Sequence, residues 1–295
     1  MLIQTYRREV PGHDASVERT LLRCSGFCVA VLRARGIVLD HDVIARAVDF
    51  FGRYRRPQIA VFLSGRGYVQ IEGRVLPLVA GDVVETDQIR TEAEGYAGSP
   101  CEVVIFEWDE GRLFEGVRRG PARVSHVGPR DVAHLRSLVA RLGSVPADRF
   151  VLDLAASLRA LGGPRVAEPD PRAIPRAPAP FARAYGALGH ALSRLDLHPS
   201  LPELAGSLGL SERQMSRRLV EIGRRYGHPF LGWRDFIEEM RLEWAAHLLS
   251  VPNLPLEHVS RLAGYRSTVA LCHAFSSRGA DTPGRIARRL SERWR

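Results

Sequence analysis

Lysine is absent from this sequence, so all 42 basic residues are arginines. With 33 acidic residues the formal net charge is +9, which favours a partner that carries negative charge. The sequence also lacks the roughly 18–20 consecutive apolar residues of a membrane-spanning helix. It has no signal-peptide pattern near its start, because polar residues 5–9 follow Met1–Ile3 directly. We therefore expect a soluble, cytoplasmic protein.

Cysteine and histidine are both scarce where a metal centre would need them. The four cysteines form no C-x-x-C pair and no disulfide framework. Cys24 and Cys28 fall in one predicted strand, where they could share a face as a metal or redox pair or be small buried hydrophobes. No histidine occurs between Ile59 and Trp108. A site of several histidines and a carboxylate is therefore not expected, and neither is a cofactor.

Residues 1–110 are rich in short apolar, β-branched runs separated by turn residues, which predicts strands at about 20–110 and a sandwich or barrel. Gly65-Arg66-Gly67 predicts a hairpin between two of these runs, Ile59–Leu63 and Tyr68–Ile71. The other runs are Phe27–Leu32, Val75–Val79 and Glu102–Trp108.

A helical period replaces this pattern over residues 129–161 and predicts two helices joined near Gly143–Pro146. Their apolar stripes could cover their own domain or a partner chain, and the sequence leaves both open. The stretch Gly162–Pro180 contains six prolines, a density that favours extended linker chain. We expect it to separate a first domain, residues 1–161, from a helical domain, residues 181–295.

The helical domain is the more basic one, with 17 arginines against 11 acidic residues. Within it, the stretch Leu201–Leu219 predicts a short helix, a sharp turn at Gly209 and a second helix capped by Ser211. Met215 and Leu219 would form the inner face of that second helix. A short helix, a glycine turn and a capped basic helix are typical of a helix-turn-helix unit.

The same arrangement occurs a second time. Leu256–Ala263 predicts a helix, Gly264 a turn, and Ser267 the cap of a further helix with Leu271 and Phe275 facing inward. A long helix at Phe236–Leu249 would join the two units.

In this order, residues 201–286 resemble the DNA-binding domain of the AraC/XylS family of bacterial regulators. The matching pieces are L-A-x-x-x-G-L-S (Leu204–Ser211), S-x-R-x-M-x-R-x-L (Ser211–Leu219), F-I-x-x-x-R-L-x-x-A-x-x-L-L (Phe236–Leu249), V-S-x-x-A-G-Y (Val259–Tyr265), L-x-H-x-F (Leu271–Phe275) and Thr282-Pro283. Each piece alone is a weak signal, whereas all of them in sequence are a strong one.

The resemblance implies that the second helix of each unit enters a major groove, with the two grooves about 34 Å apart. By position, it implies base contacts from Arg213, Ser216, Arg217, Thr268, Val269, Cys272 and His273. It implies phosphate contacts from Arg218, Arg266, Arg278, Arg285 and Arg288. The chain departs from the family at His273 and Ser276, where basic residues are usual, and in a longer stretch between Leu219 and Phe236. We therefore expect the first unit to contribute more of the specificity.

The β-rich part fits the same family, because Gly67–Asp82 resembles the hairpin of a cupin barrel. Five aromatic side chains could line an effector pocket there or be ordinary core, namely Phe27, Phe62, Tyr68, Phe106 and Trp108. The predicted fold is α+β: a cupin-like barrel with two helices, then an all-α domain with two helix-turn-helix units joined by a linking helix.

The predicted function is that of a bacterial transcription regulator and not an enzyme. It would bind double-stranded promoter DNA as a homodimer under the control of a small-molecule effector. RNA polymerase is a further candidate partner. Two alternatives remain: an effectorless regulator whose barrel only dimerises, and a cupin metalloenzyme fused to a DNA-binding module.

Overall fold

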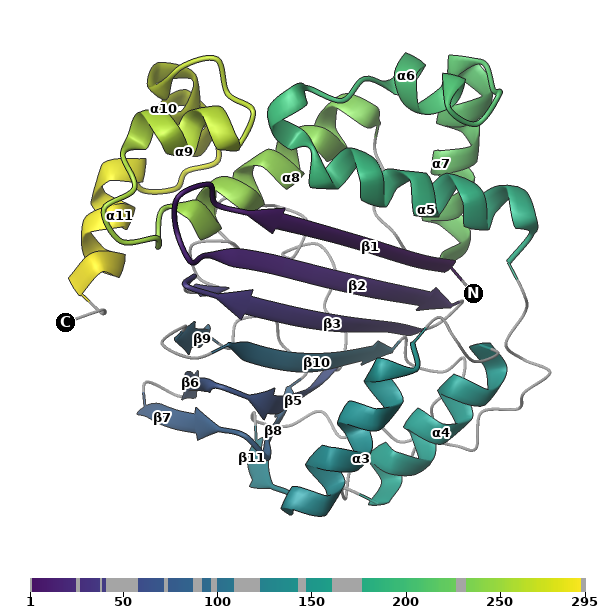
Figure 1. Cartoon of the computed structure of the whole chain (residues 1–295), viewed down its shortest axis with the longest axis vertical. Coiled ribbons are helices and arrows are strands. Elements are labelled where there is room, and N and C mark those ends of the chain that lie inside the picture. The colour runs from purple at the N-terminus through teal and green to yellow at the C-terminus, as the bar shows by residue number, and fades with distance from the viewer. Residues whose placement is uncertain are drawn as a thin grey trace.

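The structure is a computed structural model, and it consists of a β-rich part followed by a helical part (Figure 1). It describes residues 2–24, 27–37, 39–40, 58–71, 74–86, 92–96, 100–108, 123–142, 147–160, 177–226 and 232–292. The predicted α+β class is confirmed: sheets and two helices come first, and helices alone make up the last part. None of the helices described is long and apolar enough to cross a membrane.

The strands form two antiparallel sheets. The larger has the order β1 (Leu2–Glu9), β2 (Ser16–Cys24), β3 (Phe27–Arg35), β10 (Cys101–Trp108), β5 (Gln58–Ser64), β8 (Asp82–Thr86) and β11 (Arg123–His126). The smaller has the order β4 (Leu39–Asp40), β9 (Glu92–Tyr96), β6 (Arg66–Ile71) and β7 (Arg74–Val79). Leu78 of β7 packs with Phe62, Val84 and Val103 of the large sheet, so an apolar cluster joins the two sheets.

The hairpin predicted around residues 65–67 is wrong. β5 pairs with β10 and β8 in the large sheet, whereas β6 pairs with β7 and β9 in the small one. The chain changes sheets at Gly65, which has a φ of +85° and lies so close to β10 that a Cβ would be 2.7 Å from the Cα of Cys101. Only glycine accommodates both conditions without strain. The hairpin of this region is the next one along, β6–β7.

The first strands also differ from expectation. β1 begins at Leu2 and β2 at Ser16, well before the predicted start near residue 20. Cys24 ends β2 opposite Phe27, while Cys28 lies in β3 opposite Arg23. The expected shared face is therefore wrong, because the two cysteines occupy different strands and pack in different apolar clusters.

Two helices follow the sheets as predicted, α3 (Pro129–Ala140) and α4 (Ala147–Ala160). Leu135 and Leu138 of α3 and Phe150 of α4 pack with Val29 and Val61 on one face of the large sheet. The apolar stripes of this helix pair thus cover the chain's own sheet.

The helical part contains α5 (Ala179–Ser193), the 3₁₀ turn η2 (Leu195–Leu197), α6 (Leu201–Gly206), α7 (Glu212–Tyr226), α8 (Trp233–Leu248), α9 (Leu256–Leu262), α10 (Thr268–Ser277) and α11 (Pro283–Ser291). α5 begins inside the predicted linker, with Pro180 in its first turn, where proline costs no hydrogen bond. Residues 161–176, most of that linker, lie outside the described ranges.

A single hydrophobic core crosses the expected domain boundary. Leu2 and Tyr6 of β1 belong to the same buried cluster as Leu188 of α5 and Trp244 of α8. α5 lies along the outer edge of β1 (Figure 1). There, a Cβ on Gly189 would be 2.3 Å from the carbonyl oxygen of Thr5. The helix thereby covers the free edge of the sheet, which would otherwise offer unpaired backbone groups to another chain.

Candidate nucleic-acid interface

The first helix-turn-helix unit consists of α6 and α7. Between them Gly209 adopts a φ of +65°, which favours glycine. Ser211 and Gln214 then close a capping box: Ser211 Oγ accepts a hydrogen bond from the Gln214 N–H at 3.3 Å, and Gln214 Oε1 accepts one from the Ser211 N–H at 2.9 Å. The start of α7 is therefore fixed by side chains that the sequence places next to the turn.

α7 is strongly amphipathic. Its inner face is buried and comprises Met215, Leu219, Ile222 and Tyr226. The predicted base-reading residues Arg213 and Arg217 are exposed one turn apart, whereas Ser216 and the predicted phosphate contact Arg218 are partly buried. Because i and i+4 share a helix face, the two exposed guanidinium groups can reach one surface together.

The second unit consists of α9 and α10. Gly264 has a φ of +79°, and a Cβ there would be 2.5 Å from the Leu195 carbonyl oxygen. Ser267 caps α10, its Oγ accepting a hydrogen bond from the Ala270 N–H at 3.2 Å. Leu271 and Phe275 are buried, as predicted. Of the predicted base contacts, Val269 and His273 are exposed, while Thr268 and Cys272 are partly buried.

α8 joins the two units, which lie toward its opposite ends (Figure 1). It begins at Trp233, three residues before the predicted start. Glu239 of α8 forms an ion pair with Arg278 at 3.5 Å, and the Tyr265 hydroxyl donates a hydrogen bond to Glu238 at 3.4 Å. Arg278, predicted to contact phosphate, thus also links the second unit to α8.

Three further predicted phosphate contacts lie around the second unit. Arg266 is exposed just before the cap of α10, and Arg285 and Arg288 are exposed on α11. Ile286 and Leu290 bury the opposite face of α11. The exposed positive charge of this unit therefore surrounds α10 rather than lying on it.

A polar seam between the sheet and the helical part was not predicted. It comprises Arg8, Arg19, Arg23, Tyr185 and Glu243, which we call the arginine seam. Arg19 of β2 forms an ion pair with Glu243 of α8 at 2.9 Å, with side-chain exposures of 15% and 5%. Arg8 of β1 donates a hydrogen bond from Nε to the Leu192 carbonyl at 2.7 Å, and its guanidinium lies 5.3 Å from the centre of the Trp244 ring. The linking helix of the two units is thus fastened to the sheet.

The third arginine of the seam extends it along α5. Arg23 of β2 donates a hydrogen bond from Nε to the Tyr185 hydroxyl at 3.0 Å. Burial raises the pKa of Tyr185 to about 12, so the phenol stays neutral and able to accept this bond near neutral pH. The signal in the sequence for this seam is weak. Leu2, Gln4 and Tyr6 alternate along one face of β1, and the next position on that face is the charged Arg8.

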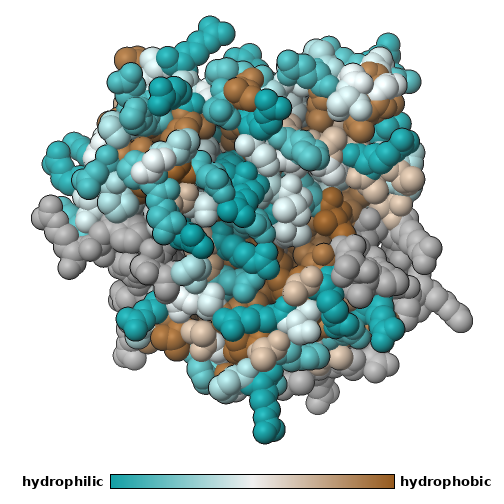
Figure 2. Space-filling view, in the orientation of Figure 1, coloured by the Kyte–Doolittle hydropathy of each residue, from teal (hydrophilic) through white to brown (hydrophobic). Residues whose placement is uncertain are grey.

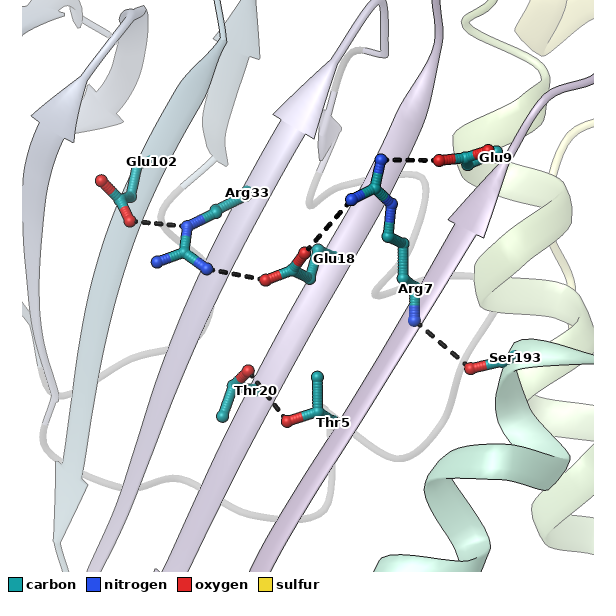
Figure 3. Close-up of polar contacts among 8 residues, drawn as sticks. All are labelled: Thr5, Arg7, Glu9, Glu18, Thr20, Arg33, Glu102 and Ser193. Atoms are coloured by element: carbon teal, nitrogen blue, oxygen red, sulfur yellow. Dashed lines mark hydrogen bonds and ion pairs between the residues drawn. The ribbon is translucent and has the colours of Figure 1, made fainter. Parts of the chain in front are cut away.

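The outer face of the same strands is a ladder of opposite charges (Figure 3). Arg33 lies between Glu18 and Glu102, with N–O distances of 2.6 and 2.7 Å, and Arg7 pairs with Glu9 at 2.6 Å. The space-filling view shows hydrophilic side chains over the middle of this sheet (Figure 2). Because its charges are balanced in pairs, this face is a poor electrostatic match for nucleic acid.

The structure does not bring the five candidate pocket residues together. Phe27 and Phe106 stack with ring centres 5.7 Å apart in the cluster under α3 and α4. Phe62 lies in the cluster between the two sheets, on the other face of the large sheet. The side chains of Tyr68 and Trp108 are outside the described ones. Phe27, Phe62 and Phe106 therefore do not line one pocket together. Phe27 and Phe106 pack in the core beneath the helices, whereas Phe62 lies on the opposite face of the sheet.

Within the described ranges, no group of three or more histidine, cysteine or acidic side chains is placed to hold a metal ion. Asp82 of β8 and His126 of β11 form one histidine–carboxylate pair in the large sheet. His126 Nδ1 lies 2.8 Å from Asp82 Oδ1. Asp82 also accepts a hydrogen bond from the Val79 N–H at 2.7 Å, so its carboxylate is occupied in holding the β7–β8 turn.

No protein-family model matches the chain. A stretch of 80 residues, 27% of this chain, is 34% identical to the HTH-type transcriptional regulator VqsM of Pseudomonas aeruginosa, and it spans 22% of the length of that regulator.

Among solved structures, ToxT from Vibrio cholerae aligns over 88% of this chain and 98% of its own, with 8% identity and a TM-score of 0.34. The AraC-like transcriptional activator CuxR aligns over 82% of this chain and 85% of its own, with 12% identity and a TM-score of 0.31. What the comparisons show at the level of sequence is that this 80-residue stretch is similar to part of an HTH-type transcriptional regulator.

Proposed function

We propose that this chain is a transcription regulator that binds double-stranded promoter DNA through α7 and α10. The observation that carries the proposal is the pair of capped helices, each preceded by a positive-φ glycine turn, at the two ends of α8. Such second helices enter successive major grooves. The chemistry is equilibrium binding and not catalysis.

The two helices would contribute unequally. α7 exposes Arg213 and Arg217, and an arginine that donates two hydrogen bonds to guanine discriminates this base by about 1–3 kcal/mol. α10 exposes Val269 and His273 and has no arginine in its length. We therefore assign the larger share of sequence discrimination to α7, and to Arg266, Arg285 and Arg288 a phosphate-holding role.

The test is binding of the full chain to DNA enriched from a random pool, at one fixed salt concentration. Arg217→Ala should weaken binding to the enriched sequence about 5- to 150-fold while leaving weak, non-specific binding largely intact. Arg130→Ala, an exposed arginine on α3, is the matched control and should bind as the wild type does. Equal binding by all three proteins would contradict the assignment of α7.

We also propose that the β-rich part binds a small-molecule effector and that the chain forms a homodimer. The effector proposal starts from a small buried apolar cluster of Leu21, Cys28 and Ala30 in the large sheet, which is separate from the cluster shared with the helical part and from the one shared with the small sheet. Native mass spectrometry of the purified full chain measures both the oligomeric state and the presence of a retained ligand. A dimer without a retained ligand would favour the effectorless alternative, and a monomer without one would contradict both proposals.

A further inference from the structure

The exposed face of α10 is unusual for a helix that meets DNA, because it carries no formal charge. Leu271, Ala274 and Phe275 face the core. The outward positions are Thr268, Val269, Cys272, His273 and Ser276, and none of them is an arginine or an acidic residue. A helix of this kind gains little from the phosphate backbone, so its contribution has to come from contacts at the base edges.

Val269 dominates that face. It is 76% exposed, more than the other exposed large hydrophobic residues in the described ranges, which reach 56% at Leu197 and 49% at Val220. A lone exposed valine on a surface needs no explanation by itself. This one is the second residue after the Ser267 cap, at the end of a recognition helix that approaches base edges most closely.

We propose that Val269 packs against the C5-methyl group of a thymine, so that the second unit recognises its half-site by apolar contact. The inference rests on the proposed DNA-binding function and assigns the kind of base that α10 reads. A β-branched side chain in a helix is confined to one main rotamer, so little side-chain entropy is lost when it is buried. The thymine methyl is the feature of the major groove that a hydrocarbon can recognise.

The charges around α10 support a separation of roles, in which α10 contacts bases and the neighbouring arginines contact phosphates. Arg266 is exposed immediately before the helix cap, and Arg285 and Arg288 are exposed on the neighbouring helix α11. These three can hold the two phosphate strands and bring the neutral face of α10 to the floor of the groove. α10 then needs no cation of its own.

The experiment replaces thymine by uracil, which removes only the methyl group. The full chain is first used to enrich its DNA from a random pool. Each thymine of the enriched site is then replaced singly by deoxyuridine, and affinity is measured at fixed salt. We expect one position in the half-site opposite to that of α7 to lose about fourfold in affinity, the value of one buried methyl group.

Val269→Ala should weaken binding to the thymine-containing site by a similar factor and should remove the sensitivity to uracil at that position. Val79→Ala, a 47% exposed valine on β7, is the matched control and should leave the sensitivity intact. If no position shows a uracil effect that Val269→Ala removes, while Arg217 still matters for binding, the inference is overturned and the proposed function stands. If the full chain enriches no sequence, the proposed function fails and this inference with it.

Discussion

Replacing Glu243 by alanine tests whether the arginine seam holds the helical part to the sheet. The carboxylate is 5% exposed and lies 2.9 Å from the guanidinium of Arg19, which is 15% exposed. Arg8, itself buried, lies in the same seam and contacts the neighbouring Trp244 ring. Truncation would leave the buried guanidinium of Arg19 without the carboxylate of Glu243. Removal of one partner from a buried ion pair costs about 3–5 kcal/mol of unfolding free energy.

The matched control is Glu9→Ala on the opposite face of β1. Glu9 pairs with Arg7 at 2.6 Å, a shorter contact than that of the seam, but both side chains are more than half exposed. Solvent screening limits such a pair to about 0–1 kcal/mol. The comparison therefore separates the effect of burial from that of distance.

Urea denaturation of the full chain, followed by tryptophan fluorescence and circular dichroism, measures both variants. We expect Glu243→Ala to lower the free energy of unfolding by at least 2 kcal/mol more than Glu9→Ala does, about the difference between the two ranges. Replacing Arg19 and Glu243 together by methionine should recover most of the loss, because neither charge of this ion pair is then left. Equal losses in Glu243→Ala and Glu9→Ala would refute the view that the seam is a structural joint.

Two further predictions concern the helix-turn-helix units. Gly209→Ala should lower the free energy of unfolding by about 1–2 kcal/mol, because the positive φ is the only source of strain and the new Cβ would have no neighbour within 4 Å. Gly264→Ala should cost about 2–5 kcal/mol in the same denaturation assay, because its Cβ also meets a backbone carbonyl; equal losses would contradict this. Cys272 should be the first described cysteine to react with a thiol reagent in the folded chain, and bound DNA should protect it. Burial raises the pKa of Cys24 to about 12 and that of Cys101 to about 11, which keeps both as unreactive thiols. Fast labelling of Cys272 in the DNA complex would argue against groove insertion of α10.

The helix-turn-helix units could be predicted from sequence because their determinants are local. Gly209 and Ser211, like Gly264 and Ser267, specify a turn and a cap within a few residues, and the apolar spacing of α8 gives its inner face. Local signals of this kind can be recognised without knowledge of the tertiary structure.

The sheet was harder to predict where contacts with other parts of the chain determine which residues are buried. β1 was missed because its buried face carries Gln4 and Arg8, which interrupt the expected alternation of apolar and polar residues. Arg8 is tolerated there because the helical part supplies the Leu192 carbonyl and the Trp244 ring to its guanidinium group. The change of sheet at Gly65 was missed for the same kind of reason, since the close approach of β10 is not visible in the local sequence.

The sequence identified the candidate base contacts, but it did not show which residues hold their helices in place. The structure adds that Arg278 is bound to Glu239 of α8. It also adds that α8 is fastened to the sheet by Glu243. Each of these depends on residues far apart in the chain.

Enrichment of DNA from a random pool by the full chain, repeated with Arg217→Ala, tests the central claim most directly. We expect the wild type to enrich two short half-sites whose centres are about 10 base pairs apart, one helical turn. We expect Arg217→Ala to keep the half-site read by α10 and to lose the guanine preference in the half-site read by α7. Absence of any enriched sequence, or identical sequences from both proteins, would contradict this expectation.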